Sequence, residues 1–171
     1  MEIVTSLKPL IAVIIPSIAA VLIMITGKKS PNLRESWSFI GGAICCGITL
    51  SMVPDVLNGN ILQCNVFNIL PGISVKLNVD PLGIIFAIVA SFLWILASSY
   101  NVGYMRDLKE HAQTRYYACF SIAITGAVGV ALSGNVFTLY LFYEIISIFT
   151  YPLVAHHQDE EGYAGAKKYI S

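Results

Sequence analysis

The sequence predicts an all-α protein that crosses a membrane several times, with residues 1–171 forming a single membrane domain. Hydrophobic residues make up 56% of the chain and charged residues only 12%, with a mean hydropathy of +0.73. A typical soluble domain has about 25% charged residues, so this class is excluded. The formal net charge is zero, which indicates no basic surface for nucleic acid.

Five apolar segments are each long enough to span a hydrocarbon core, which takes roughly 17–25 helical residues. They cover residues 9–26, 37–57, 81–104, 116–132 and 136–155. In the first, Pro16 interrupts the helical hydrogen bonds near the centre. The second begins with Trp37, a residue typical of the membrane interface. The sequence therefore predicts about five transmembrane helices in contact with a lipid bilayer.

Small residues recur at every fourth position in three of these segments. The sets are Gly41, Cys45 and Thr49; Gly83, Ala87 and Ser91; and Ala123, Ala127 and Ala131. This spacing places each set on one helical face, where small side chains let a neighbouring helix approach closely. We therefore interpret the three sets as helix–helix contacts.

The longest connection, residues 58–79, contains two apolar-rich runs around Leu70-Pro71-Gly72. Such a turn signal between two runs predicts a short β-hairpin on the membrane surface. Asp80-Pro81 then matches a helix N-cap followed by proline at the first helical position. An ion entrance at Asp80 is the alternative, and capping is favoured.

Glu144 is the only acidic or basic residue (Asp, Glu, His, Lys or Arg) in the apolar run 136–155. At about 1.5 Å per residue it lies roughly 12 Å along the helix, near the middle of the bilayer. A carboxyl there is costly and usually faces a bundle interior, a partner or a water path. Burial also favours its neutral form, which suits proton uptake and release. The alternative is a carboxyl held by a neighbouring Tyr or Ser that only locks helix packing.

Other polar groups share the helical face of Glu144. Tyr140, Glu144, Ser147 and Tyr151 follow one another at spacings of four, three and four residues, which places them in one stripe. Pro152 frees the carbonyl of Ile148, which predicts a kink one turn beyond the carboxyl. We interpret the four stripe residues as candidates for proton or ion translocation.

The sequence indicates no cofactor and no metal site. The four cysteines have no CxxC or Cys/His spacing, which argues against zinc or iron–sulfur ligation. No glycine-rich dinucleotide fingerprint is present, so we expect neither flavin nor nicotinamide binding. His156 and His157 are adjacent and diverge on a helix, and a solvated loop is the favoured interpretation.

The basic residues predict the orientation of the chain. With every Lys and Arg assigned to a loop or tail, two lie on one side, Lys8 and Lys76, and eight on the other: Lys28, Lys29, Arg34, Arg106, Lys109, Arg115, Lys167 and Lys168. Basic residues are enriched in cytoplasmic loops. We therefore expect a multi-pass protein of the plasma (cell inner) membrane, or an equivalent energy-transducing membrane, with its N-terminus outside and its C-terminus in the cytoplasm.

Residues 134–144, continuing through Ser147 to Tyr151 and Leu153-Val154, resemble the fifth transmembrane helix of antiporter-like membrane subunits. These subunits occur in NADH–quinone oxidoreductase, membrane-bound hydrogenases and Mrp-type cation/proton antiporters. Residues 79–83 and 99–105 resemble the family's third helix and its exit, and residues 166–170 the lead-in to the sixth. Among the branches, the sequence around Glu144 is most similar to the Mrp D-type.

The resemblance implies a proton- or cation-translocating subunit of a larger membrane complex, such as a respiratory oxidoreductase, that is not catalytic alone. In the family, a glutamate on the fifth helix pairs with a lysine on a broken seventh helix, and Glu144 matches that glutamate. The chain ends at Ser171, where the sixth helix would begin, so it resembles only the first portion of a longer fold. Other subunits or segments, including whatever supplies the lysine-bearing helix, are the expected partners.

Two other interpretations stay open on the sequence alone. The chain could be a truncated or split-gene product that packs in a complex without transport. It could also be a small channel that oligomerises around Glu144.

Overall fold

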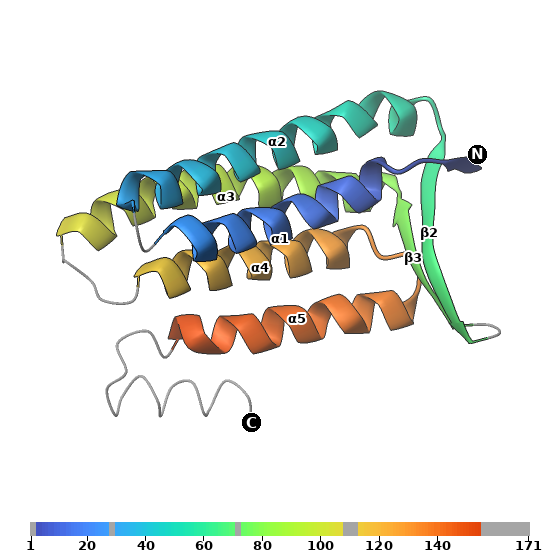
Figure 1. Ribbon diagram of the computed structural model, residues 1–171. Coiled ribbons are helices and arrows are strands. Elements are labelled where there is room, and N and C mark those ends of the chain that lie inside the picture. The colour runs from blue at the N-terminus through green and yellow to red at the C-terminus, as the bar shows by residue number, and fades with distance from the viewer. Residues whose placement is uncertain (1–2, 28–29, 71–72, 108–112, 155–171) are drawn as a thin grey trace.

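The computed structural model describes residues 3–27, 30–70, 73–107 and 113–154. Five helices run side by side, each antiparallel to the next along the chain (Figure 1). They are α1 (Lys8–Thr26), α2 (Pro31–Leu57), α3 (Pro81–Asp107), α4 (Gln113–Ala131) and α5 (Val136–Val154). The prediction of an all-α polytopic membrane protein is therefore confirmed, with one helix for each predicted segment.

The helix ends differ from the predicted segments because apolar runs mark the lipid-facing part of a helix and not its full length. The second segment was predicted from residue 37, whereas α2 begins at Pro31. Proline fits the first helical position, where the N–H has no partner in any case. The assignment of every basic residue to loops or tails is wrong: Lys8, Arg34, Arg106 and Arg115 lie in helices, and Lys76 lies in β3.

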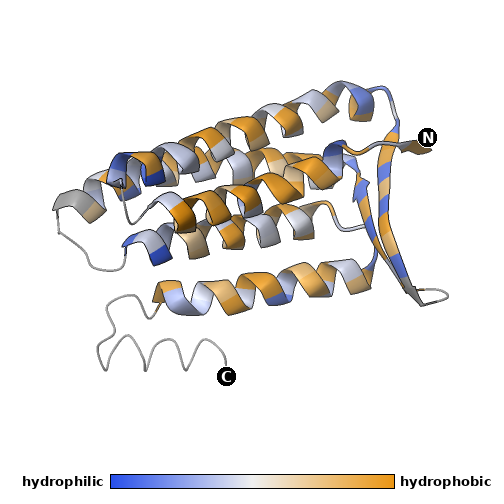
Figure 2. Cartoon of the chain, in the orientation of Figure 1, coloured by the Kyte–Doolittle hydropathy of each residue, from blue (hydrophilic) through white to orange (hydrophobic). Residues whose placement is uncertain are grey.

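Four of the described helices are long and apolar enough to cross a membrane: α1, α2, α3 and α5. The fourth helix, α4, is less apolar because it lies in the middle of the bundle, against α1, α3 and α5. Its buried Ser121 and Thr125 face other helices, and the Thr125 hydroxyl shares a 2.9 Å hydrogen bond with Ser17 of α1. Apolar residues cover most of the helical surface in Figure 2, whereas the sheet alternates polar and apolar residues.

A three-stranded sheet stands across one end of the bundle (Figure 1). Strands β2 (Ile61–Leu70) and β3 (Ile73–Val79) form the predicted antiparallel hairpin. A short strand that the sequence did not predict, β1 (Ile3–Thr5), pairs in parallel with β2. Every second residue of β3 is buried against the bundle, ending at Leu77 and Val79, so the hairpin covers the helix ends.

Hydrogen bonds fasten the sheet to the turn between α4 and α5. The Gly134 N–H donates to the Lys76 carbonyl at 2.7 Å, and the Lys76 N–H donates to the Thr138 hydroxyl at 3.0 Å. The Asn135 side-chain amide donates to the Ser74 carbonyl at 2.7 Å. The start of α5 is thus fixed to β3.

The small-residue sets of α2 and α3 lie between helices, as predicted. Gly41 lies so close to Ala19 of α1 and Trp94 of α3 that an added methyl group would come within 2.9 Å of both. Gly83, Ala87 and Ser91 are likewise buried. The third predicted set, at Ala123, Ala127 and Ala131, is only half-buried.

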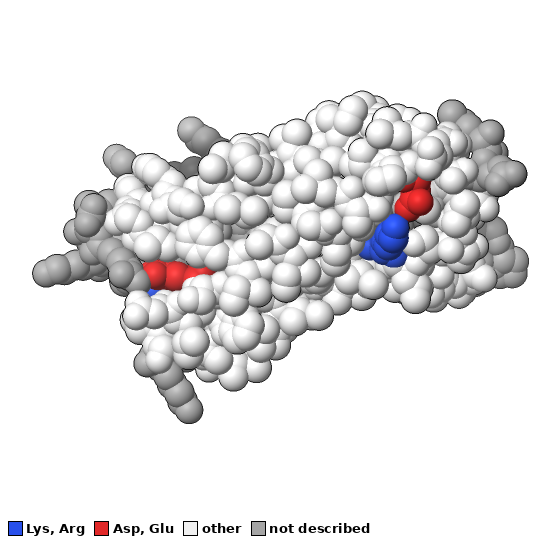
Figure 3. Space-filling view, turned by 90° about the horizontal axis from the view of Figure 1, so that it is seen from above, with Lys and Arg blue, Asp and Glu red and all other residues white. Residues whose placement is uncertain are grey.

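Charged side chains lie near the ends of the bundle on the face seen in Figure 3, and the middle of that face carries none. Near the sheet, Lys8 of α1 pairs with Asp55 of α2 at 2.8 Å. At the opposite end, Arg34 lies 3.8 Å from Glu35, and both side chains are almost fully buried. This distribution fits an uncharged band of surface exposed to lipid hydrocarbon.

Candidate functional site

The candidate site lies on α5, the helix at the edge of the bundle (Figure 1). Among the described elements, α5 packs mainly against α4, with a smaller contact to β3. Two glycines of α4 make this packing close: the Phe142 ring lies on Gly129, and Ile146 lies on Gly126. Phe142 and Ile146 are four residues apart and so define the face of α5 that meets the bundle.

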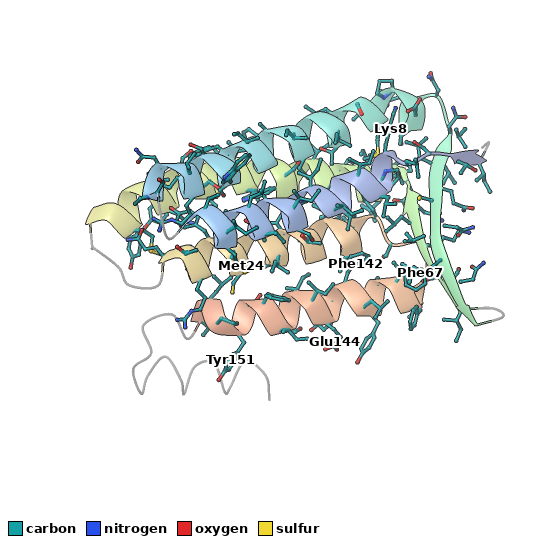
Figure 4. The ribbon with its side chains drawn as sticks, in the orientation of Figure 1. Lys8, Met24, Phe67, Phe142, Glu144 and Tyr151 are labelled. Atoms are coloured by element: carbon teal, nitrogen blue, oxygen red, sulfur yellow. The ribbon has the colours of Figure 1, made fainter. Side chains whose placement is uncertain are left out.

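The predicted polar stripe lies on the opposite face of α5. At about 100° per residue, Glu144 is rotated by roughly 200° from Phe142. In Figure 4, Phe142 points toward the other helices, whereas Glu144 and Tyr151 point away from them. Tyr140 is 57% exposed, and Glu144, Ser147 and Tyr151 are partly exposed. The structure therefore brings the four residues onto one face, and that face is directed outside the bundle.

Within this stripe, the Tyr140 hydroxyl interacts with the Glu144 carboxyl one turn later. Within the described residues, the ion pairs are Lys8–Asp55 and Arg34–Glu35, and neither involves Glu144. A carboxyl on a membrane helix needs a cation, a hydrogen-bond donor or water to be stable in its charged form. A basic group for Glu144 would have to come from outside the four other helices described here.

Pro152 lies inside α5, two residues before the helix ends at Val154. Proline has no N–H to donate to the carbonyl four residues earlier, which belongs to Ile148. The kink expected at this point remains a prediction. Residues 155–171, including His156 and His157, lie outside the described part of the chain.

Asp80 acts as the helix cap that the sequence predicted. Its Oδ1 accepts a 2.7 Å hydrogen bond from the N–H of Gly83, in the first turn of α3. This geometry satisfies one of the free N–H groups at the start of a helix. Asp80 also borders a cavity of about 390 Å³ between α3 and α4, but its role as an ion entrance remains a prediction.

The sequence did not reveal the buried polar cluster at the end of the bundle opposite the sheet. Arg34 donates a hydrogen bond to Gln113 of α4, and its guanidinium lies 5.3 Å from the centre of the Tyr117 ring. Gln113 in turn donates to the Met105 carbonyl at 3.0 Å. The sequence signal was Arg34, three residues after Pro31 at the start of α2, and this residue was assigned to a loop. The cluster joins α2, α3 and α4.

Comparison with known proteins shows what this chain is similar to. No family model matches the chain. The A1 subunit of the Na(+)/H(+) antiporter of Staphylococcus aureus is 30% identical over 155 residues, which are 88% of this chain and 19% of that protein. The chain is homologous to an antiporter-like membrane subunit. It spans about a fifth of the length of the curated relatives that it matches.

Two solved structures share the fold of this chain. The structure of the membrane-bound sulfane sulfur reductase, an archaeal respiratory membrane complex, matches with a TM-score of 0.84 and 21% identity over 96% of this chain and 34% of that chain. The Mrp complex from Dietzia sp. DQ12-45-1b matches with a TM-score of 0.80 and 20% identity, covering 96% of this chain and 31% of that chain. The resemblance to antiporter-like subunits is thus confirmed, while the D-type branch remains a prediction, since the Staphylococcus relative is an A1 subunit.

Proposed function

We propose that this chain is the N-terminal portion of a proton- or cation-translocating antiporter-like subunit in a multisubunit membrane complex of Mrp or respiratory type. Its homology to an Na(+)/H(+) antiporter subunit supports the class of activity. Its fold, shared with subunits of two membrane complexes, supports assembly with other subunits. The chain contributes the part of the transport path that contains Glu144.

The observation that carries this proposal is the direction of the polar stripe on α5. A carboxyl that only locked packing inside this chain would face α4, where Phe142 and Ile146 contact the glycines. Glu144 lies on the opposite face, in contact with Tyr140, and near the middle of α5. A carboxyl placed in this way is available to a basic group on a neighbouring helix and can exchange a proton with it.

Substituting Glu144 tests the proposal in the complete assembly. Gln keeps nearly the size and hydrogen-bonding reach of Glu but carries no charge and releases no proton. We expect Glu144→Gln to assemble normally and to abolish cation-coupled proton transport, measured as a pH change in membrane vesicles. Leu139→Val is the matched control because Leu139 is exposed on the same helix but lies off the stripe. Full transport by Glu144→Gln, at normal assembly, would remove Glu144 from the path.

A small oligomeric channel is the second candidate, since the same outward stripe could meet its equivalents in other copies of this chain. Reconstitution of the 171-residue chain in liposomes separates the two. Under the subunit proposal, the chain alone inserts and moves no protons. Proton flux from the pure chain that Glu144→Gln abolishes would favour the channel.

We also propose that the sheet lies outside the cell and the opposite end of the bundle in the cytoplasm. The excess of basic residues at that opposite end supports this orientation. A reporter fused after Lys29, Glu110 or Ser171 is expected to be cytoplasmic, and one inserted in the loop Asn58–Gly59 external. The reverse pattern would invert the orientation and leave the transport proposal untouched.

A further inference from the structure

A groove of about 480 Å³ opens between α1, α4 and α5 at the end of the bundle opposite the sheet. Its walls are Met24 of α1, Ile122 of α4 and Phe149 of α5. In Figure 4, Met24 lies in the space between α1 and α5. At Gly126 and Gly129, α4 has no side chain, so α5 packs closely against it. The groove opens beyond these two glycines. One turn closer to the start of α4, Ile122 takes the place of glycine.

The mouth of this groove differs chemically from its walls. Thr114 and Arg115, both in the first turn of α4, border it, and Arg115 is exposed. Ligand sites commonly have volumes of 300–1,000 Å³ and combine apolar walls with a few polar groups. In membrane proteins, basic pockets between helices near the membrane surface bind the head groups of anionic lipids.

We propose that this groove binds an anionic phospholipid, with an acyl chain between Met24, Ile122 and Phe149 and the phosphate beside Arg115. The groove lies at the end of the membrane helices, where lipid head groups are found. An acyl chain fits the apolar walls, and a negative head group complements the guanidinium and the Thr114 hydroxyl. An apolar partner helix would instead offer no group that complements the charge of Arg115 at the mouth of the groove. This inference does not depend on transport by Glu144.

Lipid retention by the 171-residue chain tests the proposal. The chain is placed in nanodiscs of equal phosphatidylglycerol and phosphatidylcholine, released into mild detergent, and its bound lipids are identified by native mass spectrometry. We expect the unmodified chain to retain phosphatidylglycerol in preference to phosphatidylcholine. Arg115→Gln is expected to reduce this preference about fivefold, the change that corresponds to about 1 kcal/mol for one basic side chain at a membrane surface. The matched control, Lys76→Gln, removes one cation at the opposite end of the molecule and is expected to leave the preference unchanged.

A second variant tests the acyl-chain half of the site. Cys119 lines the groove and is half-buried, so Cys119→Phe fills part of the volume and leaves Arg115 in place. We expect it to retain less of both lipids, whereas Cys46→Phe, at a half-buried cysteine of α2 outside the groove, retains the normal amount. Unchanged helical content by circular dichroism establishes that both variants fold. Equal retention of the two lipids by the unmodified chain, no retained lipid, or the same lipid preference for Arg115→Gln and Lys76→Gln would each overturn the proposal.

Discussion

Helices α2 and α5 both carry a stripe of residues at helical spacing, yet the two stripes point in opposite directions. Gly41, Cys45 and Thr49 of α2 face into the bundle and are buried between α1 and α3. Tyr140 and Glu144 of α5 face away from every other described helix (Figure 4). Spacing alone therefore identifies a helical face but does not say what that face contacts.

The chemistry of each stripe explains the difference. Small residues on α2 let the backbones approach, and hydroxyl groups then link the helices, with Ser38 bonded to Ser98 at 2.8 Å and Thr49 to Ser91 at 3.3 Å. The stripe on α5 offers a carboxyl and hydroxyl groups, which need polar partners that the facing side of α4 does not provide. Inward stripes should thus govern the stability of this bundle, and the outward stripe should govern assembly and transport.

The largest effect on stability is expected at Ala87, which is fully buried in the inward stripe of α3. Ala87→Phe inserts a ring where no space exists, and such overpacking typically costs about 1–3 kcal/mol or more. Phe92→Ala is the control on the same helix, since Phe92 is 52% exposed, and it should change stability much less. Both are measured as free energies of unfolding by titrating detergent-solubilised protein with SDS. Equal losses would mean that the stripe is not an interface.

A smaller loss is expected when a hydroxyl is removed between α2 and α3. Ser38 bonds with Ser98 and also accepts a 3.2 Å hydrogen bond from the Trp94 indole. Ser38→Ala deprives both buried groups of this partner, and we expect a loss of about 1 kcal/mol in the same titration. The exposed Ser36→Ala is the control, because Ser36 bonds only within its own helix, to the Asn32 carbonyl. If the two variants unfold alike, the hydroxyl pair does not stabilise the helix contact.

A still smaller effect is expected at the ion pair near the sheet. The Lys8 and Asp55 side chains are 42% and 38% exposed, so solvent screens their attraction. Lys8→Gln should reduce the free energy of unfolding by about 0.2–1 kcal/mol, and high salt should reduce the difference from the unmodified chain. A loss of several kcal/mol that salt did not change would indicate that lipid or protein shields the pair from solvent.

The smallest effect on the stability of the isolated chain is expected at Glu144, although the proposed function predicts a loss of transport for the same variant. Because the carboxyl faces outward, Glu144→Gln should change the stability of the 171-residue chain by less than about 0.5 kcal/mol. The same unfolding titration checks this value. A clear loss of stability would show that Glu144 supports packing within the bundle, which would contradict the comparison between the two stripes.

The sequence was sufficient for features that depend on local pattern. Apolar runs predicted the helices, the Leu70-Pro71-Gly72 signal predicted the hairpin, and Asp80-Pro81 predicted the cap. It was not sufficient where the outcome depends on distant partners. Nothing local marks Ile3–Thr5 as a strand, since three residues gain stability only by pairing with β2.

The same limit explains the errors in charge placement and the incomplete account of the site. Arg34 was assigned to a loop because an arginine before an apolar run usually lies in water, whereas Gln113 and Tyr117 from α4 enclose it. For Glu144, helical periodicity grouped the polar residues correctly. The sequence did not show which way this group points. The structure shows it, because Gly126 and Gly129 of α4 contact the opposite face of α5.

The fastening of α5 to the sheet has a mechanical consequence. The Lys76–Thr138 hydrogen bond fixes α5 near its first turn, while the groove leaves its far end less closely packed. A tilt of α5 would therefore pivot at the sheet. At about 1.5 Å per residue, Glu144 lies roughly 9 Å from this pivot and Phe149 roughly 16 Å. Any tilt that shifts the carboxyl by a given distance therefore moves the end of the helix nearly twice as far, because the pivot lies in the first turn of α5, where the helix is bonded to the sheet.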